Sequence, residues 1–280
     1  MRLSEKISNA LHKACIELSP DVLDRLAWAR EKETEAPSLA VLDAILNNLE
    51  IAKEKGLPMC QDTGMFLVFV DIGKSCSLSL ASVEQAILDG CAQAVESAYF
   101  RRSVVAEPVF SRMNTTTNLP PVIWWNLVEG ENLVIQVLLK GFGSENCSST
   151  RMLNPTGGEQ AVIDAVMEIV RLAQGKPCPP IFVGVGLGGS MDRAAYLSKR
   201  ALLRDSKVHN ASEEYARLED KLFASLQTLG IGSGGLGGII TALNVAIEQE
   251  PTHIAGLPLA VSINCWADRK AKIVWEGEDA

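Results

Sequence analysis

The sequence lacks three features, each of which would mark a large class of proteins. No stretch approaches the roughly 20 uninterrupted apolar residues of a membrane-spanning helix, although 47% of the 280 residues are hydrophobic. No basic cluster stands out that could neutralise a run of phosphates, and the formal net charge is −8. No two cysteines lie as close together as the paired ligands of a zinc finger or ribbon. These absences argue against a membrane protein, a nucleic-acid-binding protein and a zinc module, and they favour small-molecule or protein partners.

The first residues, MRLSEKISNALHKACIELS, alternate charged and apolar side chains at helical spacing and lack the continuous apolar stretch of a secretory signal. We therefore expect a cytoplasmic protein. In a reducing compartment, seven cysteines without close pairs would be thiols or metal ligands and not a disulfide framework.

The spacing of apolar residues predicts a mixture of helices and strands. Helices are expected at residues 3–16, 21–32 and 39–52, which form a helical lead-in over about 1–55, and then at 82–99, 159–174, 191–203 and 213–229. Strands are expected at 65–73, at 122–128 and 132–140 as a hairpin, at 181–185, and twice within 259–275, with loops at 141–158 and 230–238. With no internal repeat and no linker, this order predicts a single domain over 1–280 of the α+β (mixed α/β) class, its strands and helices surrounding a ligand-binding cleft.

Three of the seven cysteines share a local context. Cys60 lies in PMCQDTG, Cys178 in GKPCPPI and Cys265 in SINCWADRK. Each stands at a proline-marked turn or a strand end, where a thiolate can point into a cleft. Three thiolates suit an iron–sulfur cube with one open iron, which can act as a Lewis acid toward a substrate hydroxyl or carboxylate. Sequence spacing leaves this only as a possibility.

The other four cysteines are less informative. Cys15 and Cys91 lie in apolar helical patterns and are expected to be small buried hydrophobes. Cys76 carries no accompanying signal. Cys147, in GSENCSST, could either line a site or occupy a small-residue position beside one.

Two glycine-rich segments must be weighed as nucleotide sites. GVGLGGS (184–190) fits G-x-G-x-x-G, a motif that in a dinucleotide fold is followed about 20 residues later by an acidic residue after a second strand. Asp205 has this distance, but the segment before it is expected to be helical and no second strand intervenes. A dinucleotide fold is therefore discounted, and the glycines are interpreted as close-packing turns. GIGSGGLGG (230–238) lacks the Gly-Lys-Ser/Thr ending of a phosphate loop. A tightly packed or substrate-facing loop is the better interpretation of the second segment.

Seven motifs in order carry a family resemblance: PMCQDTG, YFRRSVV, NTTTNLPPV, KGFGSEN, CPPIFVGVGLGG, LGIGSGGLGG and PTHIAGLPLAVSINCWADR. From about residue 3 to its end, the chain resembles the α subunit of the two-subunit, iron–sulfur class I fumarate hydratases. The resemblance implies a 4Fe-4S cluster held by Cys60, Cys178 and Cys265, with the fourth iron free to bind substrate.

The resemblance also implies roles for other residues. Gln61 and Asp62 would reach the substrate, with Asp62 as proton donor or relay. Arg101 would grip a substrate carboxylate, for which its planar fork is suited. Gly143 would bring a backbone amide close to the substrate, and His253 would act near Asp62, contributed by a neighbouring protomer.

The implied activity is the reversible hydration of fumarate to L-malate, a step of the tricarboxylic acid cycle. Because the family places further substrate-binding residues in a β portion, and the chain stops soon after Cys265, we expect a separate β subunit and an α–α dimer within an α2β2 assembly. Two alternatives stay open: an L-tartrate dehydratase α subunit and a non-catalytic interaction subunit. Tartrate dehydratases differ at GSEN and lack PTHIAGLP, which favours fumarate and malate. The chain itself departs from the family at Phe142 and at Ser233-Gly234.

Overall fold

The computed structural model describes residues 1–275, and its contacts divide the chain into two compact units. The first unit comprises Met1–Ser19, Asn48–Gly141 and the chain from Arg269 on; the second comprises Pro20–Asn47 and Phe142–Asp268. Both units combine helices with a mixed sheet, so the predicted α+β class is confirmed. The expectation of one catalytic domain over 1–280 stays a prediction. None of the helices within residues 1–275 has the length and apolar character needed to cross a membrane.

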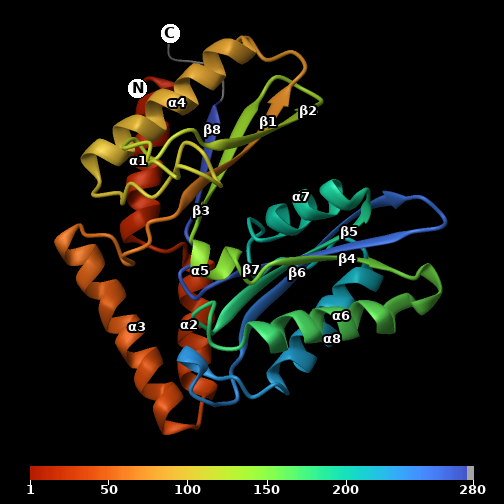
Figure 1. Ribbon diagram of the computed structural model, residues 1–280. Coiled ribbons are helices and arrows are strands. Elements are labelled where there is room, and N and C mark those ends of the chain that lie inside the picture. Colours follow the sequence, from red (N-terminus) through yellow and green to blue (C-terminus); the bar gives the residue numbers. More distant parts are fainter. Residues whose placement is uncertain (276–280) are drawn as a thin grey trace. The chain divides into compact units, whose positions relative to one another are not determined.

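The first unit is built on a four-stranded sheet in the order β2-β1-β3-β8. Its strands are β1 (Met65–Gly73), β2 (Val122–Val128), β3 (Leu133–Lys140) and β8 (Lys270–Trp275). Helices α1 (Leu3–Ile16) and α4 (Leu80–Ser97) lie along this sheet in Figure 1, and their buried faces share one apolar core with β1 and β3. Burial of one stripe of each helix against the sheet accounts for the helical spacing of their apolar residues.

The second unit contains the sheet β4-β7-β5-β6. Its strands are β4 (Ser149–Leu153), β5 (Ile181–Gly189), β6 (Ala242–Thr252) and β7 (Leu257–Asn264). Figure 1 shows α7 (Met191–Ala201) on one face, with α6 (Gly158–Ala173) and α8 (Glu213–Gln227) on the other. The unit also holds α2 (Pro20–Lys32), the first part of α3 (Ala36–Lys55) and the short α5 (Phe142–Glu145).

Strand β5 shows why the GVGLGG segment needs its glycines. Val183, Val185 and Leu187 alternate into the core beneath α6 and α8. A Cβ on Gly184 would lie 2.1 Å from the Ser198 carbonyl oxygen, and one on Gly186 would lie 2.0 Å from that of Ala194, both in α7. The predicted close packing is therefore present, but Gly184 and Gly186 lie within a strand and not in a turn. No strand separates α7 from Asp205, which agrees with discounting a dinucleotide fold.

Two other sequence predictions were wrong. Strands β2 and β3 do not form a hairpin, because β1 lies between them, parallel to β2 and antiparallel to β3. The segment 141–158 is not simply a loop, since it contains α5, β4 and a 3-10 turn at Pro155–Gly157. Strand β6 had no sequence prediction. The two strands expected within 259–275 are present as β7 and β8, although they belong to different sheets.

Candidate active site

The loop that precedes β1 holds Cys60 in the first unit, and its backbone is held on both sides. The Met59 amide donates to the Cys15 carbonyl at 3.1 Å, and the Met59 carbonyl accepts the Asn48 side-chain amide at 2.8 Å. Met59 is itself buried, whereas the following Cys60 is partly exposed. The chain thus anchors the residue before the thiol and leaves the thiol accessible.

The next residues form a compact turn that is hydrogen-bonded to the backbone of Arg101. The Asp62 carboxylate accepts the Gly64 amide at 3.0 Å, a turn in which an aspartate binds the backbone two residues on. The hydroxyl of Thr63, which is 2% exposed, accepts the Arg101 amide at 2.9 Å. Gln61 and Arg101 are both exposed and Asp62 is partly exposed, and the hydrogen bond between Thr63 and Arg101 ties the turn to the predicted carboxylate-binding residue.

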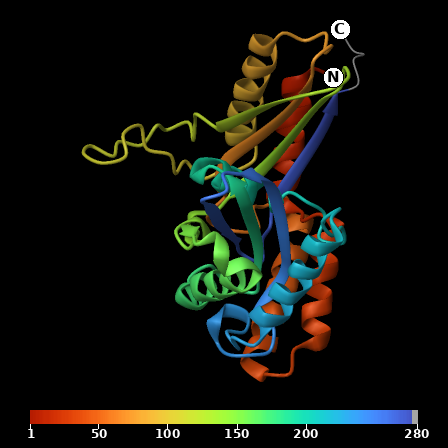
Figure 2. The ribbon, with the colours of Figure 1, turned by 90° about the vertical axis from the view of Figure 1, so that its right-hand side faces the viewer.

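Asn118, to which the sequence assigned no role, fixes this turn through a side-chain hydrogen bond to the backbone of Gly64. Its side chain is fully buried, accepts the Ser103 amide at 3.0 Å and donates to the Gly64 carbonyl at 3.3 Å. Ser103 lies in the connection between α4 and β2, and Figure 2 shows this connection extending away from the first sheet as a long loop. The NTTTNLPPV motif contained this asparagine, but its pattern alone could not identify the residue that bonds to Gly64.

In the second unit, Cys178 and Cys265 lie on neighbouring turns. The Trp266 amide, next to Cys265, donates to the Cys178 carbonyl at 3.4 Å. Cys178 is exposed and has φ of 55°, a left-handed conformation that non-glycine residues seldom adopt. Such strain costs about 1–3 kcal/mol and persists only where the surroundings impose it, which is common at functional sites.

The glycine-rich segment 230–238 supports the Cys178 turn. The Gly234 amide donates to the Pro179 carbonyl at 2.8 Å, and a Cβ on Gly235 would lie 2.6 Å from the Gly175 Cα. The Cys178 amide in turn donates to the Gly175 carbonyl at 3.2 Å. The segment is therefore closely packed, as the sequence predicted, and its packing partner is the backbone around a predicted ligand.

Gly143 and His253 are placed in the second unit, and neither role is tested by the structure. Apart from its chain neighbours and its own helix, a Cβ on Gly143 would have one described atom within 4 Å, the Lys176 carbonyl oxygen at 3.8 Å, so packing among the described residues does not explain the glycine. His253 lies exposed in the turn after β6, where its Nδ1 accepts the Ala255 amide at 3.1 Å. Both assignments stay predictions.

The chemistry of the donor set suits an iron–sulfur cluster. Cys60 belongs to the first unit, and Cys178 and Cys265 belong to the second. Within residues 1–275, no group of three or more His, Cys, Asp and Glu side chains stands in an arrangement that could hold a metal ion. The fit rests instead on three thiols at turns outside the helices, one of them in a strained backbone, because thiolates are the usual ligands of such clusters. Ligation by these three residues stays a prediction.

Two of the remaining thiols differ from these three in their burial. Cys15 and Cys91 are fully buried, as expected of small hydrophobes, and burial raises the pKa of the first to about 11 and of the second to about 12. Both therefore stay protonated at neutral pH. Cys147 is partly exposed, and its thiol lies 3.4 Å from the Gly143 carbonyl.

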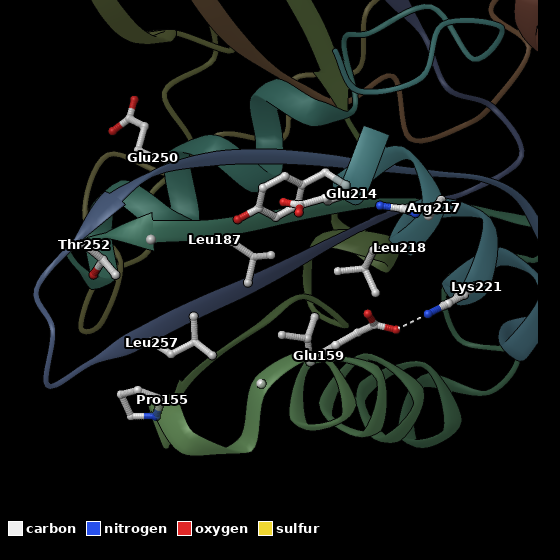
Figure 3. Close-up of a pocket in the computed structure, with 14 residues that line it drawn as sticks. Pro155, Glu159, Leu187, Glu214, Arg217, Leu218, Lys221, Glu250, Thr252 and Leu257 are labelled. Atoms are coloured by element: carbon white, nitrogen blue, oxygen red, sulfur yellow. Dashed lines mark hydrogen bonds and ion pairs between the residues drawn. The ribbon is translucent and has the colours of Figure 1, made fainter. Parts of the chain in front are cut away.

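A pocket of about 690 Å³ in the second unit contains none of the predicted site residues. Figure 3 shows Leu187, Leu218 and Leu257 pointing into it, with the ion pair between Lys221 and Glu159 at its edge. The two charged atoms are 2.6 Å apart. The lining combines these apolar side chains with charged ones and includes none of the predicted ligands, so the pocket gives no support to the predicted site.

Comparison with known proteins gives one consistent result. The family described as fumarate hydratase (fumerase) matches residues 4–274. A protein of Methanocaldococcus jannaschii named putative L(+)-tartrate dehydratase subunit alpha is 40% identical over 277 residues, which cover 97% of this chain and 96% of the relative. The L(+)-tartrate dehydratase subunit alpha of Escherichia coli UTI89 is 30% identical over 274 residues, covering 97% of this chain and 90% of the relative. The match therefore extends over both units.

Proposed function

Because the chain belongs to the fumarate hydratase (fumerase) family, we propose that it is the α subunit of an iron–sulfur hydro-lyase that removes water from a hydroxy-dicarboxylate, with L-tartrate as the first candidate substrate. The observation that carries this choice is that both relatives described above, matched along nearly their whole length, are named as tartrate dehydratase α subunits. This favours the alternative considered from the sequence over its main interpretation.

In this proposal Cys60, Cys178 and Cys265 hold the cluster, which when bound supplies a Lewis-acidic iron for the substrate hydroxyl. Arg101 binds a substrate carboxylate. Its exposed guanidinium suits that role, since the Thr63 hydroxyl fixes its backbone next to Asp62.

The remaining residues orient the substrate and move its proton. Gln61 contacts the substrate, and Asp62 transfers a proton at a carboxylate oxygen while its other contacts hold the turn. Gly143 offers a backbone amide to the substrate, since packing among residues 1–275 does not require a glycine there. His253 acts near Asp62 from a neighbouring protomer.

Hydration of fumarate to L-malate is the second candidate, favoured by the description of the matching family and by the PTHIAGLP motif. Tartrate differs from malate by one additional hydroxyl group. When a site is built to hydrogen-bond that hydroxyl, a substrate without it leaves polar groups of the site unpaired. In known cases its kcat/KM is lower by a factor of about 10⁴–10⁵. The ratio of the two kcat/KM values therefore distinguishes the candidates.

The test is anaerobic co-expression with the β subunit, reconstitution with iron and sulfide, and assay of both substrates. We expect oxaloacetate to form from L-tartrate, with a higher kcat/KM than fumarate formation from L-malate. A higher value for malate would overturn the choice of tartrate and select the second candidate. Turnover of neither substrate by a protein that carries the cluster would refute the hydro-lyase proposal.

The same preparation tests the partner and the ligands. The α chain alone should be inactive, because we propose that a β subunit supplies the rest of the site; appreciable activity without it would contradict that assignment. Replacing Cys60, Cys178 or Cys265 by serine should abolish bound iron and activity together. Cys76→Ser is the matched control, since this partly exposed thiol is not among the proposed ligands, and it should retain both.

A further inference from the structure

Arg269, the last residue of the CWADR motif, is a buried arginine whose hydrogen-bonding capacity is largely unused. It is 1% exposed, and its Nη2 lies 3.5 Å from the Leu139 carbonyl oxygen. Its Nε and Nη1 have no hydrogen-bond partner within the residues that the structure describes. A guanidinium is always charged and carries five N–H donors, and buried charges in proteins are normally paired. The first unit therefore contains a buried cation most of whose N–H donors have no partner among the described residues.

The surroundings of Arg269 place it at the predicted site. A Cβ on Gly141 would lie 3.6 Å from Arg269 Nη2 and 3.4 Å from Asp62 Oδ2, so the guanidinium and the carboxylate border the same glycine. Burial raises the pKa of the Cys15 thiol, the positive charge of Arg269 acts in the opposite direction, and the charge of Cys60 adds to the increase. Arg269 is thus near the loop that carries Cys60 and Asp62, and it follows Cys265 by four residues in the chain.

We infer that Arg269 donates N–H groups of its unpartnered Nε and Nη1 to the anionic iron–sulfur cluster bound through Cys60. This rests on the proposed function, because the cluster is part of it. A cubane with thiolate ligands is anionic, and hydrogen bonds to its sulfur atoms are among the factors that set its reduction potential. The planar fork of arginine serves this role better than lysine, which presents a single point charge.

The experiment uses the reconstituted protein with its β subunit and compares the unaltered protein with Arg269→Met and Arg269→Lys. Visible absorption gives the rate of cluster loss under air, and spectroelectrochemical titration gives the reduction potential. Arg25→Met is the matched control, since that arginine donates to the Ser206 carbonyl at 2.7 Å and lies in the second unit. Circular dichroism of each variant establishes that it is folded.

We expect Arg269→Met to lose its cluster about 10- to 100-fold faster and to have a more negative reduction potential, because a donor and a positive charge are removed. Arg269→Lys should show a smaller change in both quantities, and it keeps the test open if the methionine variant fails to fold. Arg25→Met should match the unaltered protein.

Three results would overturn the inference. An unchanged rate of cluster loss and potential in both Arg269 variants would contradict it while leaving the proposed function intact. An unchanged cluster with a raised KM would assign Arg269 to a substrate carboxylate instead. Failure of the unaltered protein to take up a cluster would overturn this inference together with the proposed function.

Discussion

Replacing Glu33 by glutamine should release the glycine-rich segment from the turn between α2 and α3. The carboxylate of Glu33 is 5% exposed. It accepts the Ile239 amide at 3.2 Å, the Ile240 amide at 3.1 Å and the Ser38 hydroxyl at 2.9 Å, besides two amides of its own turn. Burial alone would raise the pKa of Glu33, but the backbone donors outweigh it and hold that pKa below its ordinary value.

The expected loss of stability in Glu33→Gln follows from the hydrogen bonds that each carboxylate oxygen of Glu33 accepts. Glutamine keeps one carbonyl oxygen, and its amide group replaces the oxygen that accepts the Ile240 amide and the Ser38 hydroxyl. Two hydrogen bonds to a charged group are lost, each worth about 1.5–3 kcal/mol. We expect the free energy of unfolding to fall by about 3–6 kcal/mol at neutral pH, a large part of the 5–15 kcal/mol typical of a domain.

The pH dependence has a defined sign. Because the pKa of Glu33 is lowered in the folded protein, its contribution is complete above the unfolded-state value of 4.5 and is lost as the pH falls through the folded-state value. The difference in unfolding free energy between the unaltered protein and Glu33→Gln should therefore be constant near neutral pH and shrink below about pH 4.5.

Urea unfolding followed by circular dichroism, at several pH values, measures this difference. Glu31→Gln is the control, since its side chain is 72% exposed and pairs only with the adjacent Lys32 at the surface. It should change stability by less than about 1 kcal/mol. A Glu33→Gln variant as stable as the control would refute the assignment of the carboxylate as the main anchor of the glycine-rich segment.

Two further predictions concern the predicted site and its thiols. Gly64→Ala should lower the free energy of unfolding in urea by about 2–5 kcal/mol, because φ is +89° and the new Cβ would lie 2.7 Å from the Leu139 backbone carbon. Gly130→Ala is the control, since its φ is +96° but no described atom beyond its chain neighbours lies within 4 Å of the new Cβ, and it should lower that free energy by only about 1–2 kcal/mol. Equal losses would show that the close approach is relieved by movement of the strand. Native alkylation of the cluster-free protein near pH 8, followed by mass spectrometry, should modify the exposed Cys178 and spare Cys15 and Cys91, whose pKa values are raised to about 11 and 12; equal labelling of all three would contradict the burial argument.

Many of the helices and strands could be predicted because they depend on the spacing of apolar residues along the chain. Strand β1 has the predicted bounds, and the three N-terminal helices occur within a few residues of their predicted ranges, since one buried stripe repeats along each helix. The error at β2 and β3 has a physical reason. Adjacent apolar strands with a short connection suggest a hairpin, but pairing is decided by contacts far apart in sequence, and here β1 takes the place between them.

For the site, the sequence by itself determined the family and predicted the kind of chemistry. Three thiols at turns, an aspartate after the first of them and an ordered set of motifs were sufficient to indicate the family, which the comparisons confirmed. Those are properties of residue type and order, which survive without coordinates. Their specific assignments as ligands or proton donors remain predictions.

Only the tertiary structure decided which polar groups are buried and which backbone groups they hold. Asn118 could have been a surface loop residue and Arg269 a solvated end of a motif, yet the fold buries both completely or almost completely. Glu33 likewise resembles an ordinary charged residue after a helix, and it becomes an anchor only because the amides of Ile239 and Ile240 reach it across about 200 positions of sequence. Burial and long-range hydrogen bonding are properties of packing, and no local pattern of residues encodes them.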